Sequence, residues 1–483
     1  MNHLDYYASA KRPVETCVLG SGGFGRSFLA QGMRVPLMRA RIAVDIDAAI
    51  AAAAFAALGV PAADVAFCLT AEEARRAWDQ GKYIAADDLA TVVGLPIDVV
   101  VEATGNPEAG ARHGRIAIEA GHHLVLVSKE VDSVVGPYLS HLARQHGKVV
   151  TPVDGDQPSL LIGLITWAQL LGFDIIAAGK ASEYDFVYDQ AAGRMTSNGK
   201  TVALPGFAPH WALGTRPAIE VAAARAQACA ALPQRCVPDL CELLVVANAT
   251  GYMPDRPDLH APIARVSEVP SFLGATAEGG LLTGGQVLDV FHCLRRPDEA
   301  SFAGGVFVIV RCEDRVTWDL LAAKGHVISR DGERAMVYLP RHLLGLEAAT
   351  SVLEAAIHGR SSGAQAPFPR LDLVARATRN LPAGTVMAMG GHHHTMEGTA
   401  GELHPAKPLG SGNPVPFYLA ASRQLVRNVE AGALITFDDI EINPGSTLLA
   451  LRHQQDECFF GQSMASLATP PDESGWLEAA DPG

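Results

Sequence analysis

The sequence predicts an α/β protein with a doubly wound parallel sheet, followed by an α+β unit and a small β-rich unit. Short apolar strand patterns alternate with helical patterns as far as about residue 153, and glycine turns separate strand-like pieces after residue 370. Strands that alternate with helices form βαβ units, which build parallel sheets. We expect a dinucleotide-binding unit at 1–153, a substrate unit at 154–358 and a β unit at 371–445. The Pro-rich, acidic tail at 466–483 is expected to be disordered.

Apolar periodicity gives the elements of the first unit. Strands are expected at 14–20, 41–45, 98–103, 123–127 and 148–151, and helices at 24–33, 47–80, 107–120 and 134–146. The strand at 98–103 (DVVVEA) is apolar enough to indicate burial on both faces. The helix at 47–80 is predicted from its alanine content.

The middle region changes to helices interleaved with spaced strands, which is typical of an α+β substrate unit. Helices are expected at 157–171, 216–231, 238–249 and 342–358, strands at 173–179, 305–311 and 335–339, and a loop at 189–212. A Gly/Ser/Pro-rich linker at 359–370 separates this region from the β unit.

Composition narrows the class of protein. A chain of 483 residues is too long for one core, and its formal net charge of −14 makes nucleic acid and anionic membranes poor partners. Because the N-terminus has no signal-peptide core and no apolar run reaches ~20 residues, we expect a cytoplasmic protein. The eight cysteines form no C-x-x-C pair, which indicates reduced thiols. A small-molecule substrate and a homo-oligomer are expected.

A glycine-rich motif, GSGGFG at 20–25, lies between the first strand and the first helix. It matches G-x-G-x-x-G, in which Gly20 allows a tight turn, Gly22 lets the backbone approach a pyrophosphate, and Gly25 lets the helix pack on the strand. The helix N-terminus offers free N–H groups to phosphates. The motif predicts a Rossmann-type dinucleotide site. The residues expected to contact the cofactor here are Gly20, Gly22, Gly23, Phe24 and Gly25.

The end of the second strand bears on the choice between NAD and NADP. Asp45 stands 20 residues after Gly25, where a carboxylate takes the adenosine ribose hydroxyls and repels a 2′-phosphate. Arg39 and Arg41 are close in sequence and could instead accommodate that phosphate. The balance leans slightly to NAD, and NADP stays open.

Polar residues follow two further strands at the edge of the sheet where ligands bind. Thr104, Gly105 and Asn106 end the strand at 98–103, and we expect them beside the nicotinamide ribose. Lys129 follows the strand at 123–127, where it can donate to a substrate oxygen. An ordinary strand-to-helix turn and a solvated lysine are the structural alternatives.

The start of the middle region supplies more candidates. Asp156 either caps the helix at 157–171 or faces the cleft. Lys180 ends the strand at 173–179, and an apolar approach would lower its pKa and suit proton transfer. Lys180 or Lys129 is therefore the expected proton donor. Asp156 or Glu220 would orient the lysine or hold a divalent ion, if one is used.

Other polar residues are weaker candidates for the substrate site. Arg216 and Glu220 are spaced i,i+4 on a predicted helix and either pair with each other or face substrate. Asn248 interrupts an apolar helix and needs a partner, for which a substrate is one option. The run 392–394 (HHH) has no acidic or cysteine neighbour at ligand spacing, so no metal site is predicted.

Several motifs carry a family resemblance. GSGGFG, VEATGNPEAG and HHLVLVSKE resemble the dinucleotide unit of the homoserine dehydrogenase superfamily. The segments DGDQPSL, AAGK, TRPAIE, ELLVVANATG, EGGLL and YLPRHLLGLE resemble the homoserine-dehydrogenase-like oxidoreductases with a C-terminal SAF (β-clip) domain, the 1-deoxy-D-xylulose 5-phosphate reductoisomerase-like family. ATRNLPAGTVM and LVRNVEAGALITFDDIEI resemble the two halves of that domain. The resemblance covers about residues 14–445.

The resemblance implies NAD(P)H-dependent reduction of a carbonyl, preceded in reductoisomerase-like members by an α-ketol rearrangement. It implies that Lys180 and Tyr338 lie at the substrate, with Arg216 as the anion-binding arginine. A sugar phosphate needs several basic donors, whereas Glu183 follows Lys180 closely. A hydroxy or keto acid is equally compatible. The alternatives are a homoserine-type alcohol dehydrogenase without rearrangement and a non-catalytic nucleotide-sensing protein.

Overall fold

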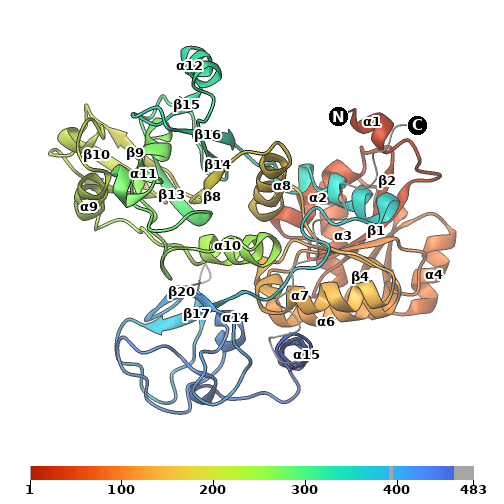
Figure 1. Cartoon of the computed structure of the whole chain (residues 1–483). Helices are drawn as coiled ribbons and strands as arrows, with labels where there is room; N and C mark the ends of the chain where they lie inside the picture. The colour runs from red at the N-terminus through yellow and green to blue at the C-terminus, as the bar shows by residue number, and fades with distance from the viewer. Residues whose placement is uncertain (1, 391–394, 462–483) are drawn as a thin grey trace, which may run out of the picture.

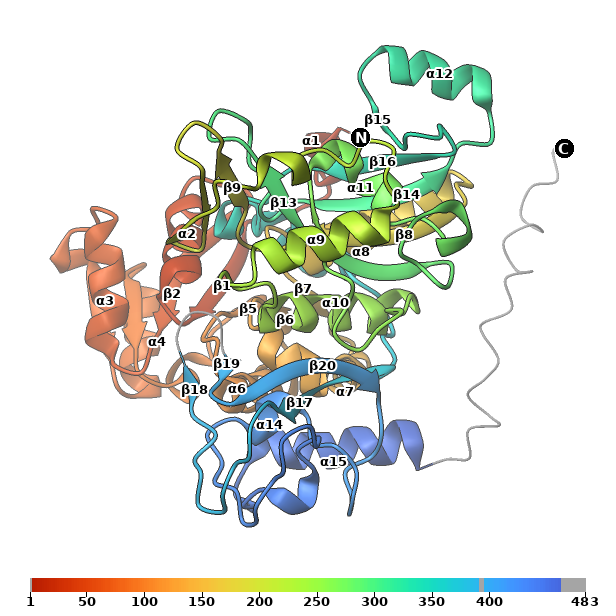
Figure 2. The ribbon, with the colours of Figure 1, turned by 90° about the vertical axis from the view of Figure 1, so that its left-hand side faces the viewer.

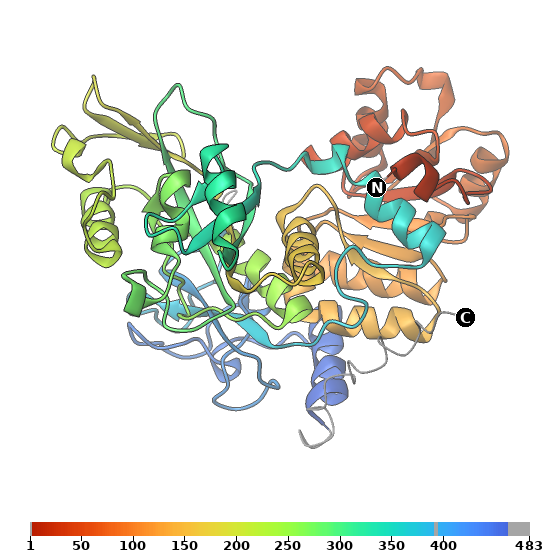
Figure 3. The same ribbon diagram turned by 45° about the horizontal axis from the view of Figure 1, so that its top comes forward.

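Two β-sheets and a smaller β-rich unit organise the chain in the computed structural model (Figure 1). The structure describes residues 2–390 and 395–461. Helices α8 (Gln157–Leu170) and α10 (Val237–Thr250) lie between the two sheets, as Figure 3 also shows for α8. Within the described ranges, no helix has the length and apolar character needed to cross a membrane.

The first sheet confirms the predicted doubly wound architecture. Its seven strands are parallel and lie in the order β3-β4-β2-β1-β5-β6-β7. They are β1 (Val14–Leu19), β2 (Met38–Val44), β3 (Val65–Cys68), β4 (Tyr83–Ala86), β5 (Val99–Glu102), β6 (His123–Leu126) and β7 (Val150–Pro152). The winding reverses between β1 and β5, and ligands bind in open α/β sheets outside the strand ends at such a switch point.

Helices cover both faces of this sheet. Because side chains alternate along a strand, Val18 of β1 packs into one core cluster, while Cys17 and Leu19 pack into another. Helices α2 and α3 cover the Val18 face, and α4 to α7 cover the other. Their bounds are α2 (Gly23–Gly32), α3 (Ala48–Ala57), α4 (Ala71–Asp79), α5 (Leu89–Val92), α6 (Pro107–Glu119) and α7 (Lys129–Gln145), and a short α1 (His3–Tyr6) precedes β1.

The second sheet is mixed and has nine strands, in the order β11-β10-β9-β13-β8-β14-β16-β15 with β12 paired to β13. The strands are β8 (Ile175–Ala181), β9 (Phe186–Asp189), β10 (Arg194–Ser197), β11 (Lys200–Ala203), β12 (Ile263–Ala264), β13 (Val287–Arg295), β14 (Val306–Arg311), β15 (Val327–Ile328) and β16 (Arg334–Leu339). Helices α8 and α10 cover the face toward the first unit. Helices α9 (Ala218–Ala228) and α11 (Val269–Phe272) cover the other face, and α12 (Arg315–Ala323) precedes β15.

The segment after β16 returns to the first unit. Its helical pieces are η5 (Leu344–Leu346), α13 (Ala349–Leu353) and η6 (Glu354–His358). Val352 and Leu353 pack in the same core cluster as Val18 and Phe28. This segment, cyan in Figure 1, therefore covers the first sheet although it follows the second.

The C-terminal unit contains the antiparallel pair β17 (Leu371–Ala377) and β20 (Thr399–Pro405). Strands β18 (Met389–Gly390) and β19 (Thr395–Met396) form a second pair, and isolated bridges such as Arg376 with Leu434 join distant turns. Two helices complete the unit, α14 (Phe417–Ala420) and α15 (Thr447–Phe460). Figure 2 shows this unit beneath α10 and alongside α6 and α7.

Three element predictions were wrong. The helix predicted at 47–80 is interrupted by strand β3 (Val65–Cys68), which pairs with β4 at the edge of the sheet. Helix propensity is a local property and cannot predict pairing with a distant strand. The loop predicted at 189–212 contains the hairpin of β10 and β11. The helix predicted at 342–358 begins only at 349. Strand β13 and helix α15 had not been predicted.

Candidate functional site

A cavity of about 380 Å³ lies between the switch point of the first sheet and the second unit. The first unit contributes the N-terminus of α2 and the ends of β5 and β6, and the second unit contributes β8, α10 and the turn before β14. The lining residues are Phe24, Ala103, Gly105, Val127, Ser128, Lys129, Glu130, Asp156, Gln157, Lys180, Glu183, Pro238, Glu242, Ala303, Gly304, His342 and Leu344. The cavity thus brings together residues from distant parts of the sequence.

The glycine turn has the geometry that a dinucleotide needs. Gly20 has a φ of +88°, and a Cβ there would lie 2.6 Å from the Ala103 carbonyl oxygen. A Cβ on Gly25 would lie 2.0 Å from the Gly20 carbonyl oxygen, so the helix requires glycine. No atom of the described residues lies within 4 Å of the Cβ positions of Gly22 and Gly23. The N-terminus of α2 therefore faces open space in which a phosphate could approach the backbone.

Asp45 follows β2 directly beside the glycine turn. Its carboxylate accepts hydrogen bonds from the Ser21 N–H at 2.7 Å, the Ser21 hydroxyl and the Ile46 N–H at 2.8 Å. Arg39 and Arg41 lie on β2 itself and are ion-paired with Glu15, at 3.2 Å and 3.5 Å. Arg41 precedes Asp45 by about 13 Å of strand. Both arginines, which were considered as partners for a 2′-phosphate, are therefore already paired with Glu15.

The turn after β5 is held by a buried carboxylate. Glu102 accepts hydrogen bonds from the hydroxyl of Thr104 and, at 3.1 Å, from its N–H. The Gly105 N–H donates to the Ser128 hydroxyl at 2.8 Å, which joins this turn to the end of β6. Asn106 caps α6 by accepting from the Ala109 N–H. Of the three turn residues predicted at the nicotinamide, only Gly105 lines the cavity.

Two lysines from different units share one carboxylate. Glu242 of α10 is ion-paired through one oxygen with Lys129 and through the other with Lys180. Lys180 also donates to Asp239 at 2.7 Å, and Asp156 lies 3.8 Å from the Lys129 ammonium. The side chain of Lys180 is 1% exposed and that of Lys129 is 22% exposed. Lys129 is therefore the lysine that a ligand in the cavity can reach.

Electrostatics keeps both lysines protonated. Burial opposes the charged form, but Asp156 and Glu242 raise the pKa of Lys129 well above its ordinary value. Asp239 and Glu242 likewise raise the pKa of Lys180 against its burial, contrary to the lowered pKa expected for it. Burial would raise the pKa of Glu242, but the two ammonium groups lower it to about 2. Burial raises the pKa of the neighbouring Glu130 to about 7.

The segment returning from β16 closes one wall of the cavity. His342 lines it, and its Nδ1 lies 3.0 Å from the Gly304 carbonyl oxygen. Because a carbonyl only accepts, Nδ1 donates this hydrogen bond, and Nε2 is the ring nitrogen left for a ligand. Gly345 packs so tightly on α2 that a Cβ would lie 2.5 Å from the Phe28 nitrogen. This packing fixes His342 next to the glycine turn.

Of the two further predicted site residues, Asp156 lines the cavity and Tyr338 does not. Asp156 caps α8 by accepting from the Gln157 N–H at 2.9 Å and also lines the cavity, so both interpretations of it apply. Tyr338 pairs with Phe307, whereas Lys180 pairs with Val306 one residue away. Since strand side chains alternate, Tyr338 faces the opposite side of the sheet from Lys180 and lines a different cavity.

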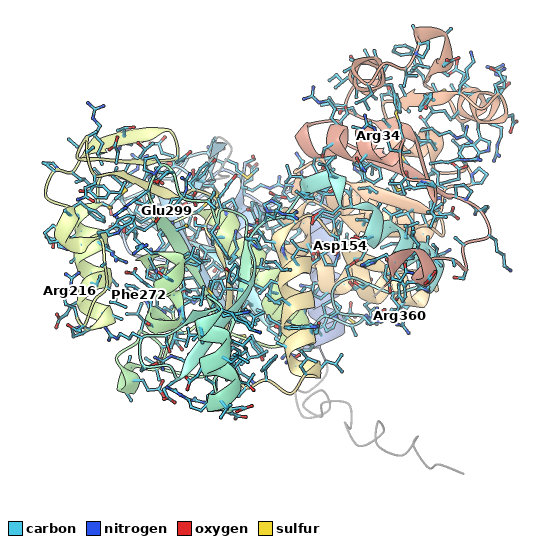
Figure 4. The ribbon with its side chains drawn as sticks, turned by 90° about the horizontal axis from the view of Figure 1, so that it is seen from above. Arg34, Asp154, Arg216, Phe272, Glu299 and Arg360 are labelled. Carbon is cyan, nitrogen blue, oxygen red and sulfur yellow. The ribbon has the colours of Figure 1, made fainter. Side chains whose placement is uncertain are left out.

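The three residues expected to bind substrate lie elsewhere. Arg216 donates to the carbonyl oxygens of Pro209 and Ala212, at the outer edge of the second unit and far from Asp154 (Figure 4). Glu220 is exposed on α9, and no ion pair between it and Arg216 occurs among the described residues. Asn248 is buried and accepts from the Arg370 N–H at 2.8 Å, so its partner is the backbone that leads into β17.

Glu242, Asp239 and His342 belong to the site but were not predicted from the sequence. The two acids lie on an apolar helix, 62 and 59 residues from Lys180, and their one visible signal is a charge inside an otherwise apolar run. Within residues 2–390 and 395–461, no group of three or more His, Cys, Asp or Glu is arranged to hold a metal ion. The histidine run at 392–394 lies outside the described residues.

Comparison with solved structures finds partial likenesses to oxidoreductases. A crystal structure titled as DOX-P reductoisomerase with magnesium is 19% identical with a TM-score of 0.26, over 35% of this chain and 46% of that one, so the chain spans less than half of that protein. An oxidoreductase from Bacillus cereus is 14% identical (TM-score 0.33, 72% of this chain and 89% of that one). UDP-N-acetylglucosamine 3-dehydrogenase from Acidithiobacillus ferrooxidans is 13% identical (TM-score 0.37, 73% and 91%). Similarity this low transfers neither substrate nor reaction.

Sequence comparison gives one specific match. No curated protein matches the chain. Residues 238–348 match the family described as the catalytic domain of the oxidoreductase DRL. That segment contains Asp239, Glu242, Gly304 and His342, which form the second-unit side of the lysine network and of the cavity. The middle of this chain therefore resembles an oxidoreductase catalytic domain.

Proposed function

We propose that the protein is an NAD(P)-dependent oxidoreductase that reduces a carbonyl of a small, uncharged polar substrate, with NADH preferred over NADPH. One observation carries the proposal: a single cavity adjoins both the glycine turn of the first unit and the lysine–carboxylate network of the second. The match of residues 238–348 to an oxidoreductase catalytic domain supports the same reaction class. A purely nucleotide-sensing protein would not need two ion-paired lysines beside the cofactor crevice.

The residues around the glycine turn fit a dinucleotide. The free N–H groups at the start of α2 suit the pyrophosphate, and the open space over Gly22 and Gly23 admits it. Asp45 is positioned for the ribose hydroxyls and would repel a 2′-phosphate, while the nearby arginines are paired with Glu15. Bound nicotinamide would supply the hydride. This arrangement is the basis for preferring NADH.

Lys129 is the proposed proton donor. Lys129 lines the cavity, and its ammonium group stays protonated beside Glu242 and Asp156. We propose that this group donates to the carbonyl oxygen as negative charge develops there. Lys180 also lines the cavity, but its side chain is 1% exposed and its ammonium group is enclosed by Asp239 and Glu242, so it is not the proposed donor. It neutralises Glu242 and Asp239 and so fixes the carboxylate that orients Lys129.

The charge of the cavity favours an uncharged substrate. Among the described lining residues, two lysines face four acids and there is no arginine. Both lysines are already ion-paired, so the cavity has no excess positive charge for a phosphate or a carboxylate. His342 offers a hydrogen-bond acceptor at Nε2, which suits a substrate hydroxyl near the carbonyl. A hydroxy-ketone or hydroxy-aldehyde fits these features better than a sugar phosphate.

The C-terminal unit is proposed to be the SAF-type (β-clip) unit that the sequence resembles. The pair β17–β20 and the bridges that join distant turns support this assignment. The proposed reaction does not require it to contact substrate.

The proposed function is tested by following NADH and NADPH absorbance with two matched sets of substrates. One set contains uncharged hydroxy-ketones and hydroxy-aldehydes, and the other contains their phosphorylated or carboxylated counterparts. We expect NADH oxidation with members of the uncharged set, and oxidation at least about tenfold slower with NADPH, which corresponds to ~1.4 kcal/mol. Turnover only with the charged set would overturn the substrate class, and no turnover together with no NADH binding would overturn the function.

A further inference from the structure

The C-terminal unit contacts both helices that carry the lysine network. Helix α7 begins at Lys129, and α10 carries Asp239 and Glu242. Helix α15 packs along α7, α14 packs against α7, and the β17–β20 pair packs against α10. Figures 1 and 2 show the unit beneath these helices. The unit is thus adjacent to the site, although none of its residues in 371–390 and 395–461 lines the cavity.

One contact between α15 and α7 replaces a hydrogen bond of α7 that is missing near Pro137. Pro137 lies inside the helix, where it lacks an N–H and its ring crowds the preceding turn. Gln455 of α15, buried at 2% exposure, inserts its amide there. It donates to the Val134 carbonyl oxygen at 3.0 Å and accepts from the Tyr138 N–H at 3.2 Å. Side chains inserted into a helical ladder fix the bend of the helix. Gln455 therefore stabilises the bend of α7, the helix that begins at Lys129.

A second contact lies at the beginning of α7. Tyr418 of α14 is buried close to Cys241 and Glu130, and α14 packs against α7. The Cys241 thiol in turn donates to the Lys129 carbonyl oxygen at 3.2 Å. A chain of contacts therefore runs from Tyr418 through α10 to the backbone of Lys129.

The unit that carries these two residues is itself firmly attached. Arg452 of α15 is fully buried and ion-paired with Asp372 at 2.5 Å and with Asp456 at 2.8 Å, which joins α15 to β17. Asn248 holds the start of β17 to the end of α10 through the N–H groups of Arg370 and Leu371. These contacts hold α15 on the C-terminal unit and hold that unit on α10, so the position of Gln455 relative to α7 is constrained.

We propose that the C-terminal unit is a positioning part of the active site, in which Gln455 and Tyr418 hold α7 so that the Lys129 ammonium stays in the cavity. The consequence for activity rests on the proposed function, whereas the consequence for α7 does not. A displacement of about 1 Å at a catalytic group is enough to cost roughly a hundredfold in rate.

The test uses the full chain with Gln455→Ala and Tyr418→Phe, and the controls are Gln454→Ala, an exposed neighbour on α15, and Tyr252→Phe, a buried tyrosine elsewhere. Amide hydrogen exchange is measured over residues 129–142. We expect Gln455→Ala to speed exchange there roughly tenfold, as for the loss of a hydrogen bond, and both test variants to exceed their controls. Tyr418→Phe keeps the ring and carries the test if Gln455→Ala does not fold.

Steady-state kinetics gives the second readout. Both test variants should lower kcat roughly tenfold and leave the KM for NADH within about twofold, because the glycine turn is not touched. Exchange over 129–142 that matches the controls in both variants would overturn the proposal, as would an unchanged kcat in an active enzyme. If the wild-type chain turns over no substrate, the proposed function fails, and the exchange experiment alone decides the positioning role.

Discussion

Among the single residues of the site, Lys129 and Lys180 differ in exposure, and we expect them to have different roles. Lys129 reaches the cavity and is stabilised in its charged form, while Lys180 is enclosed by Asp239 and Glu242. General acids contribute most when they touch the reacting oxygen. A buried cation whose partners are also buried contributes instead to stability, because its loss leaves those charges uncompensated.

Replacement of each lysine by methionine should separate these roles. Lys129→Met is expected to lower kcat by about a hundredfold or more, because it removes the proton donor. The Kd for NADH should stay within about twofold, because Glu242 keeps Lys180 as its counter-charge and the glycine turn is not touched. Lys180→Met should destabilise the fold by about 3 kcal/mol because Asp239 and Glu242 lose their cation. Stopped-flow absorbance and chemical denaturation give the two values. A kcat for Lys129→Met near that of the wild type would refute its role.

Asp45 makes a prediction about the cofactor. Asp45→Ala should raise the affinity for NADPH relative to NADH by about tenfold, because it removes the charge that opposes a 2′-phosphate. Asp47→Ala, two residues farther along, is a matched control, because Asp47 caps α3. Fluorescence titration with both cofactors measures the ratio. An unchanged ratio of NADPH to NADH affinity in Asp45→Ala would show that this carboxylate does not contact the adenosine ribose.

Asp132 on α7 predicts a pH-dependent stability. Burial raises the pKa of Asp132 to about 7, well above that of an unfolded aspartate. A raised pKa in the folded state means that stability is lost as pH rises from about 4 through 7. Asp132→Asn should therefore raise Tm by roughly 2–4 °C at pH 8 and change it little near pH 4. A Tm difference that is equal at the two pH values would contradict this assignment.

At the scale of elements, strand ends and strand alternation explain which parts of the site were predictable. The glycine turn, Gly105, Lys129 and Lys180 were found because each follows or ends a recognisable apolar strand. Glu242 was not found, because its approach to Lys180 depends on the packing of α10 over β8, which no local pattern encodes. Tyr338 was expected at the substrate because of the family resemblance. Its side chain faces the other side of the sheet from Lys180, because the two residues pair with adjacent residues of β14.

The glycine turn itself can be tested by a matched pair. In Gly25→Ala the new Cβ meets the Gly20 carbonyl oxygen, so both folding stability and NADH binding should fall. In Gly22→Ala the new Cβ meets no atom of residues 2–390 or 395–461, so Tm should stay within about 2 °C. NADH binding should weaken roughly tenfold, because the methyl group blocks the approach of the pyrophosphate to the backbone. Gly163→Ala in α8, also in open space, is the control. Equal NADH affinity in all three variants would exclude the turn as the cofactor site.

At the scale of the whole molecule, the chain surrounds one cavity with parts that are distant in sequence. Composition and alternation predicted a parallel sheet followed by a mixed unit, and both are present. They did not predict that residues 344–358 return to the first sheet, or that α15 supports α7, because both depend on tertiary contacts between segments that lie far apart in the sequence.

The most direct test of the central claim, that NADH binds at the glycine turn with its nicotinamide in the cavity between the sheets, is amide hydrogen exchange with and without NADH. We predict protection at three separate segments, residues 20–26, 103–106 and 340–346, and none over 395–445. Protection limited to the first segment would leave the nicotinamide outside the cavity, and protection of the C-terminal unit alone would contradict the account.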